Sequence, residues 1–342
     1  MRLLFVTQAV DTNDPVLGFV HGWLRELSQH FDEIVVVCLR AGERHLPVNV
    51  QVHSLGKERA PAGKPRYTMR FLRHIVRERG SYDVVFVHMN QEYILLAGLL
   101  WKVMGKRIYL WRNHYTGSFL TDLAAAFCTK VFCTSKFSYT AKYKKTVLMP
   151  VGIDTGLFKP VEGVVRKPRS VLFLGRIAPS KRPELLLEAL GALYKRSVPY
   201  TATLCGPGEP AYVETLKRRA EELHITDALE FSDGIKNAEA PRLFNSHEVF
   251  VNLSPSGMLD KTIFEAAACG CTVLATSKDL SGSGTMHVVE SATPEEVAAA
   301  IEKLLGLSGQ EKEDLLHTQR QCVAKHSVEA LAVRLTEHMQ NL

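Results

Sequence analysis

The chain of 342 residues contains 46% hydrophobic and 23% charged residues. These values are ordinary for a globular protein and exclude disorder, collagen-like repeats or coiled coil for the whole chain. At roughly 150 residues per domain, the length predicts about two domains. The net charge of +6 is unevenly divided: residues 1–166 hold 23 Lys and Arg against 13 Asp and Glu, and residues 167–342 hold 19 against 23.

The positive charge gathers in the segments 57–79 and 130–145. Such a face attracts anionic lipid, nucleic acid or acidic ligands, and the plain alternative is a solvated face without a partner. Nucleic acid is the weaker candidate, because no nucleic-acid-binding motif is recognisable. Four arginines recur at spacings of three and four residues, which predicts that one helix face carries them: Arg66, Arg70, Arg73 and Arg77.

The sequence contains no apolar run of the roughly 20 residues that a membrane-spanning helix needs. Met1–Thr7 is too brief for the apolar region of a signal peptide, and no small-residue cleavage site follows it. Seven cysteines without a C-x-x-C pair predict reduced, mostly buried thiols. We therefore expect a cytoplasmic protein whose basic half contacts the inner face of a membrane.

The first half alternates short apolar runs with amphipathic stretches. The runs are rich in Val, Ile and Phe and do not alternate with polar residues, so helices should cover both faces of their sheet. Phe19, Trp23 and Leu27 have the spacing of one helix face. This order predicts a parallel, doubly wound sheet. The predicted strands are Leu3–Thr7, Ile34–Leu39, Val50–Ser54, Val84–His88, Arg107–Trp111, Val131–Thr134 and Val147–Pro150.

The alternation stops and then restarts at residue 169, which predicts a linker at 156–168. The predicted strands of the second half are Val171–Leu174, Thr201–Cys205, Leu229–Phe231, Val249–Asn252 and Thr272–Ala275. The predicted helices are Pro183–Tyr194, Tyr212–Leu223, Ala240–Asn245, Thr262–Ala268, Pro294–Leu305 and Ser327–Met339.

These patterns predict an α/β protein with two Rossmann-like, doubly wound domains that face each other across a cleft. The domains are predicted at residues 1–155 and 169–322. The C-terminal segment 323–342 is predicted as a helix that can pack back on the first domain. Ligands of such sheets bind beyond the carboxyl ends of the strands.

The first candidate site follows the predicted strand Val171–Leu174. Gly175 allows close backbone approach, Arg176 can bind phosphate oxygens bidentately, and Lys181 adds a point charge. A helix begins near Pro183, and its N-terminus also favours an anion. The plain alternative is a solvated turn.

The second candidate site is the segment from Ser256 to Ala275, where a glycine-bearing loop leads into a short helix. Glu265 lies on this helix among alanines, and a carboxylate there can accept hydrogen bonds from two sugar hydroxyls. A capping or salt-bridged Glu is the alternative.

The third candidate site is the glycine turn Gly206-Pro-Gly208 after a predicted strand. It is not a G-x-G-x-x-G motif, and the chain contains no G-x-x-x-x-G-K-[ST] loop. Both observations argue against a dinucleotide oxidoreductase and a P-loop kinase.

Three motifs in this order carry a family resemblance: Gly175-Arg176 with Lys181, then Gly206-x-Gly208, then Glu265-Ala-x-Ala-x-Gly270. Preceded by the segment 151–160, they resemble the family 4 retaining glycosyltransferases of GT-B fold, over nearly the whole chain. The resemblance implies that the second domain holds a sugar nucleotide. By resemblance, Arg176 and Lys181 would bind its diphosphate and Glu265 its ribose hydroxyls.

The resemblance also implies further contacts. The segment 229–235 would line the base, with the backbone near Ile235 as the contact. In the first domain, Gly18 matches a glycine near the donor phosphate and acceptor, and His114 matches a His beside the reactive centre of the sugar. A structural role is the alternative for His114. His88 and Asn90 end another strand that we expect to face the same cleft.

The chain departs from the family pattern at one position. The family usually has a second Glu eight residues before the one at Glu265, and this chain has Gly257 there. Asp260 lies three residues further on and is the candidate substitute. Asp260-Lys261-Thr262 resembles a variant that some family members carry, so we assign these three residues to donor binding.

We therefore expect a retaining glycosyltransferase that moves a sugar from a nucleotide-sugar donor to a saccharide or lipid-linked acceptor. The resemblance implies that the chemistry needs no metal, and the nucleotide sugar is a co-substrate, so no metal or other cofactor is expected. Asp11 and Asp14 could suggest a metal, but such loop residues more often cap a helix. The alternatives are an epimerase or inverting transferase on the same fold, with Asp11 or His21 as candidate bases, and a non-catalytic sugar-nucleotide- or glycan-binding protein, which Gly257 would favour.

Overall fold

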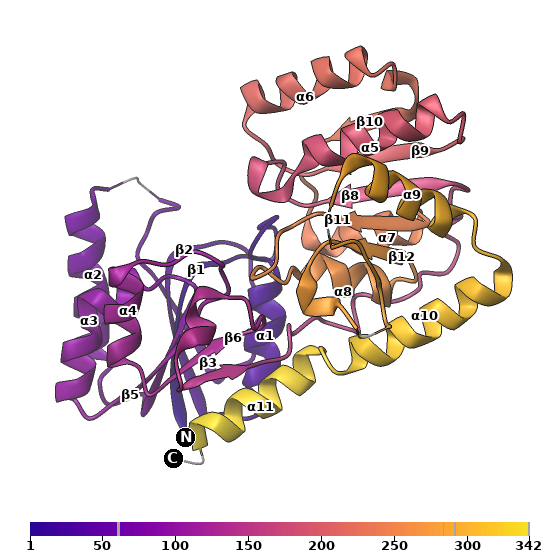
Figure 1. The fold of residues 1–342 in the computed structure, drawn as a ribbon. Helices are drawn as coiled ribbons and strands as arrows, with labels where there is room; N and C mark the ends of the chain where they lie inside the picture. Colours follow the sequence, from indigo (N-terminus) through magenta and orange to yellow (C-terminus); the bar gives the residue numbers. More distant parts are fainter. Residues whose placement is uncertain (60–61, 283, 291, 341–342) are drawn as a thin grey trace. The chain divides into compact units, whose positions relative to one another are not determined.

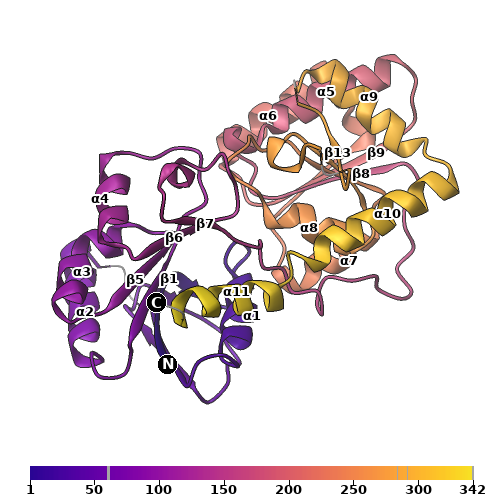
Figure 2. The same ribbon diagram turned by 60° about the horizontal axis from the view of Figure 1, so that its bottom comes forward.

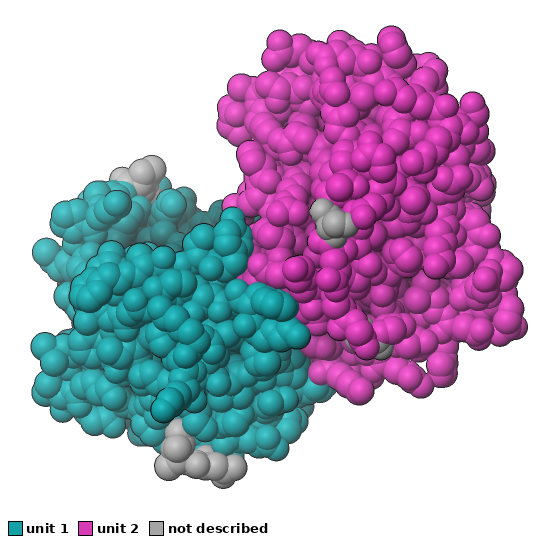
Figure 3. Space-filling view, in the orientation of Figure 1, with its two compact units in different colours: residues 1–152, 328–342 teal, residues 153–327 magenta. Residues whose placement is uncertain are grey.

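Two all-parallel sheets form the frame of the computed structural model, which describes residues 1–59, 62–282, 284–290 and 292–340. The chain divides into two compact units, coloured separately in Figure 3. Unit 1 comprises residues 1–152 and 328–342, and unit 2 comprises residues 153–327. The division therefore falls at 152/153, where we had predicted 155, and the C-terminal return begins at 328, where we had predicted 323.

The sheet of unit 1 has the strand order β3-β2-β1-β4-β5-β6-β7, and every neighbouring pair is parallel. The first six positions follow the Rossmann order, which reverses between β1 and β4. All seven strands lie where the sequence predicts them, because their β-branched and aromatic runs suit a sheet buried on both faces. Their bounds are β1 Arg2–Val10, β2 Glu33–Ala41, β3 Val50–Ser54, β4 Val84–His88, β5 Arg107–Trp111, β6 Lys130–Cys133 and β7 Thr146–Leu148.

Helices cover both faces of this sheet (Figure 1). Leu3 and Phe5 of β1 pack with α1 and α11 in one apolar cluster, and Leu4 and Val6 pack with α2, α3 and α4 in another. This alternation follows from the two-residue period of a strand. The helices are α1 Phe19–Leu27, α2 Lys64–Arg77, α3 Glu92–Val103, α4 Phe119–Phe127 and α11 Val328–Gln340.

The C-terminal helix α11 belongs to unit 1, where it packs against α1 (Figures 1 and 2). The contact is organised by Trp23, whose indole N–H donates to the carbonyl oxygen of Gly152 at 2.8 Å. Gly152 has φ +74°, and a Cβ atom at this position would lie 2.3 Å from Leu331 Cδ2 and 2.9 Å from Trp23 Nε1. A glycine is therefore required where the chain leaves the first sheet.

The sheet of unit 2 repeats the same order, as β10-β9-β8-β11-β12-β13. It reverses between β8 and β11. The strands are β8 Ser170–Leu174, β9 Thr201–Cys205, β10 Leu229–Ser232, β11 Val249–Asn252, β12 Thr272–Ala275 and β13 His287–Val288. The fold class predicted from the sequence, two Rossmann-like parallel-sheet domains, is confirmed.

Helices α5, α6 and α9 share one apolar cluster with this sheet, and α7, α8 and α10 pack together against its other face. Their bounds are α5 Pro183–Lys195, α6 Pro210–Glu222, α7 Ala240–Asn245, α8 Lys261–Ala268, α9 Pro294–Leu305 and α10 Gly309–Ala324. The short 3-10 turns of the chain are Tyr139–Lys142, Pro179–Lys181, Thr226–Ala228, Asn237–Glu239 and Lys278–Leu280. Within the described residues, every helix is too short or too polar to traverse a bilayer.

Substitution of Gly152 by Ala tests the packing of α11. We expect G152A to lower the free energy of unfolding of unit 1 by at least about 2 kcal/mol, because it combines a left-handed backbone with a clash. The matched control is G105A, since Gly105 has φ +70° but no atom within 4 Å of an added Cβ. Urea unfolding followed by tryptophan fluorescence reports on unit 1, which contains all three tryptophans. Equal losses in both variants would contradict a packing role for Gly152.

Candidate functional site

Most of the residues predicted to bind a donor lie after the two strands, β8 and β11, that flank the reversal point of the unit 2 sheet, or on the helix that follows β11. Gly175, Arg176 and Lys181 follow β8, and Asp260 and the helix α8 follow β11. In open α/β sheets the crevice at this point is where ligands bind, because the crossovers on its two sides leave on opposite faces. A cavity of about 560 Å³ opens beside it, lined by residues 176–179, 207–209 and Tyr212.

Glycines bring the loops of unit 2 into backbone contact. A Cβ atom on Gly206 would lie 1.8 Å from the carbonyl oxygen of Gly175, so no side chain fits there. The N–H of Ile177 donates to the carbonyl of Pro207 at 2.9 Å, and a Cβ on Gly208 would meet Val213 at 2.6 Å. These three glycines therefore lie together, and Arg176 is held at the cavity edge by the backbone rather than by its side chain.

Two cations of the site have different surroundings. Arg176 is exposed and makes no side-chain hydrogen bond or ion pair with the described residues, whereas Lys181 is half-buried. Lys181 Nζ donates to both carboxylate oxygens of Asp260, at 2.6 and 2.5 Å, and to Ser254 Oγ at 3.2 Å. A phosphate group that enters the site can therefore bind Arg176 directly, whereas Lys181 is already paired with Asp260.

The carboxylate of Asp260 is the centre of a polar network. It also accepts from Asn252 Nδ2 at 3.0 Å and from Ser254 Oγ at 2.5 Å. Asp260 precedes the first residue of α8, but its side chain does not cap the helix. Its carboxylate is instead turned to Lys181, which links the loop after β8 to the loop after β11. Asn252 and Ser254 were not predicted, although polar residues at the carboxyl end of an apolar strand are the signal that could have identified them.

Glu265 is the most buried carboxylate of the site, with 5% of its surface exposed. It makes no side-chain hydrogen bond with any described residue. Burial raises the pKa of Glu265, and the nearby charge of Lys261, four residues earlier on α8, partly opposes this rise. Burial lowers the pKa of Lys261 for the same reason. A carboxylate of this kind is short of donors, and two hydroxyl groups could supply them.

The backbone at Gly257, where the family that the chain resembles usually has Glu, suits a glycine. Gly257 has φ +92°, a left-handed conformation that a Glu would adopt only with strain. Its N–H donates to Asp279 Oδ2 at 3.4 Å. Thr262 lies beside Lys261 in the first turn of α8, and Ile235 follows β10 in the loop whose Gly234 packs on Pro207. Apart from Glu265, which lies in the middle of α8, the predicted residues of unit 2 lie in the loops that follow its strands or in the first turn of α8.

The predicted residues of unit 1 also follow strand ends of their own sheet. Gly18 precedes α1, and its N–H donates to the carbonyl of Asp14 at 3.0 Å. Asp14 is buried and accepts from two backbone N–H groups, of Val16 and Leu17, while Arg40 pairs with its second oxygen. Asp14 therefore stabilises the turn before α1, as a capping residue does.

The two histidines at strand ends of unit 1 have different environments. His114 is half-buried and follows β5; its Nδ1 accepts from the backbone N–H of Thr116 at 3.0 Å, which places the proton of a neutral ring on Nε2. His88 is 2% exposed, its ring lies 5.4 Å from that of Trp23, and its Nδ1 contacts Thr7 Oγ1 at 3.2 Å. The expectation that His88 faces a ligand was wrong, because its side chain belongs to the core. No group of three or more His, Cys, Asp or Glu suited to a metal occurs among the described residues.

Comparison with known proteins finds similar sequences and similar folds. Residues 168–306 match the family model of the Glycosyl transferases group 1. The chain is 28% identical over 196 residues to a D-inositol 3-phosphate glycosyltransferase of Kineococcus radiotolerans. This match covers 49% of this chain and 45% of the relative. The chain is 33% identical over 144 residues to a GDP-mannose-dependent alpha-(1-6)-phosphatidylinositol monomannoside mannosyltransferase of Mycolicibacterium smegmatis, covering 37% of each. The chain thus spans less than half the length of these curated relatives.

Solved structures cover the whole chain at low identity. Anabaena Alr3699/HepE in complex with UDP and glucose has a TM-score of 0.81 and 17% identity, with 100% of both chains covered. Sucrose-phosphate synthase from Thermosynechococcus elongatus has a TM-score of 0.80 and 16% identity, with 100% of this chain and 99% of that chain covered. The likeness confirms the GT-B fold, and the family match confirms the predicted resemblance over residues 168–306.

Proposed function

We propose that this protein is a retaining glycosyltransferase that transfers a sugar from a nucleotide-sugar donor, bound by unit 2, to a saccharide or lipid-linked acceptor. The family match of unit 2 supports the reaction class. Structures of similar fold hold UDP or UDP-glucose, and a relative is named for its dependence on GDP-mannose, which supports the donor class.

One observation carries the proposal: Glu265 is a buried carboxylate without a hydrogen-bond donor among the described residues, and the side chain of Arg176, in the same unit, is exposed and unpaired among them. A nucleoside diphosphate supplies both missing partners, since its ribose hydroxyls can donate to Glu265 and its phosphates can accept from Arg176. Lys181 would join them by exchanging Asp260 for a phosphate oxygen. Asp260, Lys261 and Thr262 then shape the donor pocket from the first turn of α8.

The chemical step in this proposal needs no side-chain nucleophile. The bond between the anomeric carbon and the diphosphate oxygen breaks, and the acceptor oxygen bonds to the same face of that carbon. The acceptor proton passes to the departing phosphate oxygen. Arg176 and Lys181 stabilise the negative charge that develops on the diphosphate, and the site holds the reactants in place. Because these cations supply the charge stabilisation, the proposal includes no metal or other cofactor.

His114 of unit 1 is assigned to the reaction by the family resemblance. Its Nδ1 is engaged by Thr116, so a neutral ring presents an Nε2–H donor suited to a sugar hydroxyl. Gly18, at the start of α1, is assigned to the donor phosphate on the same ground.

Gly257 favours one other function, a protein that binds nucleotide sugars without transferring them. The residue at this position lacks the carboxylate that the family usually directs at the donor sugar. Incubation with donor and acceptor, followed by analysis of the anomeric configuration of the product, separates the possibilities. A retained configuration supports the proposal, an inverted one indicates an inverting enzyme, and no turnover with tight donor binding indicates a binding protein.

A cytoplasmic location at the inner face of a membrane is also proposed. Unit 1 has an excess of Lys and Arg. It also presents exposed apolar side chains on α3 and α4, namely Leu96, Leu99, Val103, Phe119 and Leu120. Basic residues near an anionic leaflet each contribute about 1 kcal/mol of attraction. We expect the protein to co-sediment with anionic vesicles at low salt and to dissociate as salt shortens the Debye length. Equal binding to neutral vesicles at both salt concentrations would contradict an electrostatic contact.

Glu265→Gln tests the role assigned to the buried carboxylate. The ionised form accepts hydrogen bonds from two hydroxyls more strongly than the protonated acid does. The affinity of the wild-type protein for UDP or GDP should therefore rise as pH increases through the raised pKa of Glu265. E265Q should bind about tenfold or more weakly at alkaline pH, the loss expected for hydrogen bonds to a charged group, and should lose the pH dependence. Calorimetric titration over a pH series measures both, with the exposed Glu214→Gln on α6 as the control. Unchanged affinity in E265Q would contradict the ribose assignment.

Arg176→Ala and Lys181→Ala test the phosphate clamp. Each should raise the activation barrier by about 2–4 kcal/mol, the range for loss of one group that stabilises developing charge. Arg218→Ala, on the exposed face of α6, is the matched control. Steady-state transfer rates measure the effect, and normal kcat/KM in both clamp variants would show that the diphosphate binds elsewhere.

A further inference from the structure

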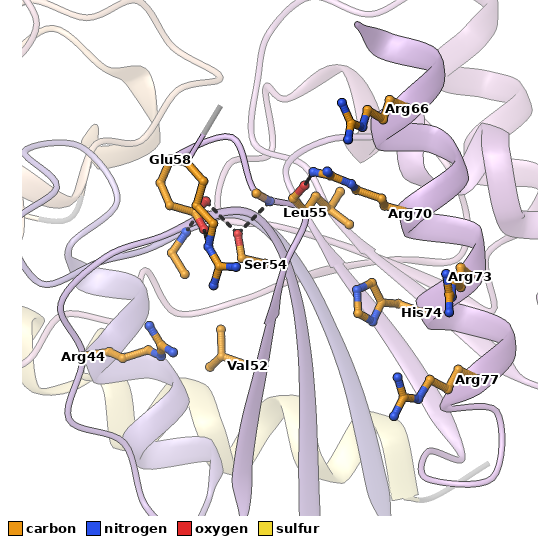
Figure 4. Close-up of a pocket in the computed structure, with 13 residues that line it drawn as sticks. Arg44, Val52, Ser54, Leu55, Glu58, Arg66, Arg70, Arg73, His74 and Arg77 are labelled. Atoms are coloured by element: carbon orange, nitrogen blue, oxygen red, sulfur yellow. Dashed lines mark hydrogen bonds and ion pairs between the residues drawn. The ribbon is translucent and has the colours of Figure 1, made fainter. Parts of the chain in front are cut away.

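A cavity of about 570 Å³ lies in unit 1 between the edge strand β3 and helix α2 (Figure 4). Its walls come from the end of β2 with the loop that follows, from β3 with the turn after it, and from one face of α2. This volume is in the range of small-molecule pockets. The cavity shares no residue with the site of unit 2.

The charge of the lining is strongly positive. Besides Glu58 and His74, the ionisable residues of the wall are six arginines: Arg44, Arg59, Arg66, Arg70, Arg73 and Arg77. The carboxylate of Glu58 accepts from Ser54 Oγ at 2.7 Å and lies 3.6 Å from Arg59 Nε. It is therefore engaged on the strand side of the cavity and does not neutralise the arginines of α2.

The arginines of α2 lie along one wall (Figure 4). Arg70 donates to the carbonyl of Leu55, and Arg77 Nε lies 3.6 Å from Glu78. The side chains of Arg66 and Arg73 are exposed and have no hydrogen bond or ion pair with the part of the chain that the structure describes. Like charges one turn apart on a helix are destabilising, so the row of arginines lowers the stability of α2, apart from the bond that Arg70 makes to Leu55.

The spacing of the arginines defines the size of an anion that could use them. From Arg66 to Arg77 the helix rises by about 16 Å, at 1.5 Å per residue. One phosphate can engage one or two guanidinium groups, so it cannot reach the whole row. Arg44 and Arg59 approach from the strand side, and His74 adds an imidazole whose Nδ1 is buried without a partner among the described residues.

We propose that the cavity between β3 and α2 binds a ligand that carries two or more phosphate groups. A planar guanidinium group can bind two phosphate oxygens at once. Several guanidinium groups around one cavity repel each other, and a bound oligoanion compensates that repulsion. The phosphates can belong to a soluble molecule or to the headgroups of a lipid, and the chemistry of recognition is the same for both. Failure of this proposal would leave the donor site of unit 2 unaffected.

Calorimetric titration with tripolyphosphate and with inorganic phosphate tests the cavity. Every protein in the series carries Arg176→Gln, which removes the exposed cation of the predicted donor clamp. Lys181, its second cation, is paired with Asp260 and is the same in every variant, so it does not affect the comparison. Arg66→Gln combined with Arg73→Gln removes two cavity arginines that make no contact needed for folding. The control, Arg218→Gln combined with Arg320→Gln, removes the same charge from exposed helix positions of unit 2.

Tripolyphosphate should bind more tightly than inorganic phosphate, and the cavity variant should bind it at least about tenfold more weakly, the loss expected for charged hydrogen bonds. The control variant should bind like the parent. Equal binding of the two anions would overturn the requirement for several phosphates. Equal losses in the cavity and control variants would show general charge attraction and overturn the site.

Vesicles distinguish the two sources of phosphate. The parent protein is sedimented with phosphatidylcholine vesicles that contain phosphatidic acid, with and without tripolyphosphate. Binding that tripolyphosphate displaces, and that the cavity variant lacks, identifies lipid phosphates as the occupant. Binding of tripolyphosphate in solution without cavity-dependent vesicle binding identifies a soluble ligand. Absence of both would overturn the proposal.

Discussion

The ion pair between Lys181 and Asp260 is the interaction on which the site of unit 2 depends. It joins the loop after β8 to the start of α8 across the point where the strand order reverses. A half-buried ammonium without a partner would be unfavourable, and Asp260 with Ser254 compensates its charge while the site is unliganded. The same pairing explains why Asp260 does not cap its own helix. A phosphate that enters the site replaces one anion by another, so Lys181 keeps a partner throughout.

The strands were predictable because their physical signal is local. Runs of Val, Ile, Leu and Phe that lack alternation indicate a sheet covered on both faces, and each predicted run forms a strand. The helices α3 and α4 were not predicted by range, and neither were β13 and α10. The strand β13 has only two residues, His287–Val288, and α10 is largely polar, with Gln319 and Val323 as its buried residues. The buried Gln319 places its amide against the backbone at Cys271 and Val273, a tertiary contact without a sequence pattern.

The features of the site that depend on close backbone contact could be predicted from the sequence. The features that depend on the direction of a side chain were harder to predict. Gly206 must be a glycine because it touches Gly175, and that requirement is visible as a motif. His88 could not be assigned from sequence, because a residue at the end of a strand can point either to the crevice or into the core. The pairing of Lys181 with Asp260 joins residues far apart in the chain, and only the fold brings them together.

The two units differ in net charge and in how their cationic side chains are paired. Unit 2 has a negative balance and holds Lys181 in a compensated pair, so that attraction for an anion there is local and depends on geometry. Unit 1 concentrates arginines around a cavity with one engaged carboxylate, so its field extends into solvent and is sensitive to salt. A field of this kind raises the local concentration of anionic partners before any specific contact forms. Under the two proposals made above, the charge asymmetry of the sequence corresponds to a division of roles, with long-range attraction in unit 1 and stereospecific binding in unit 2.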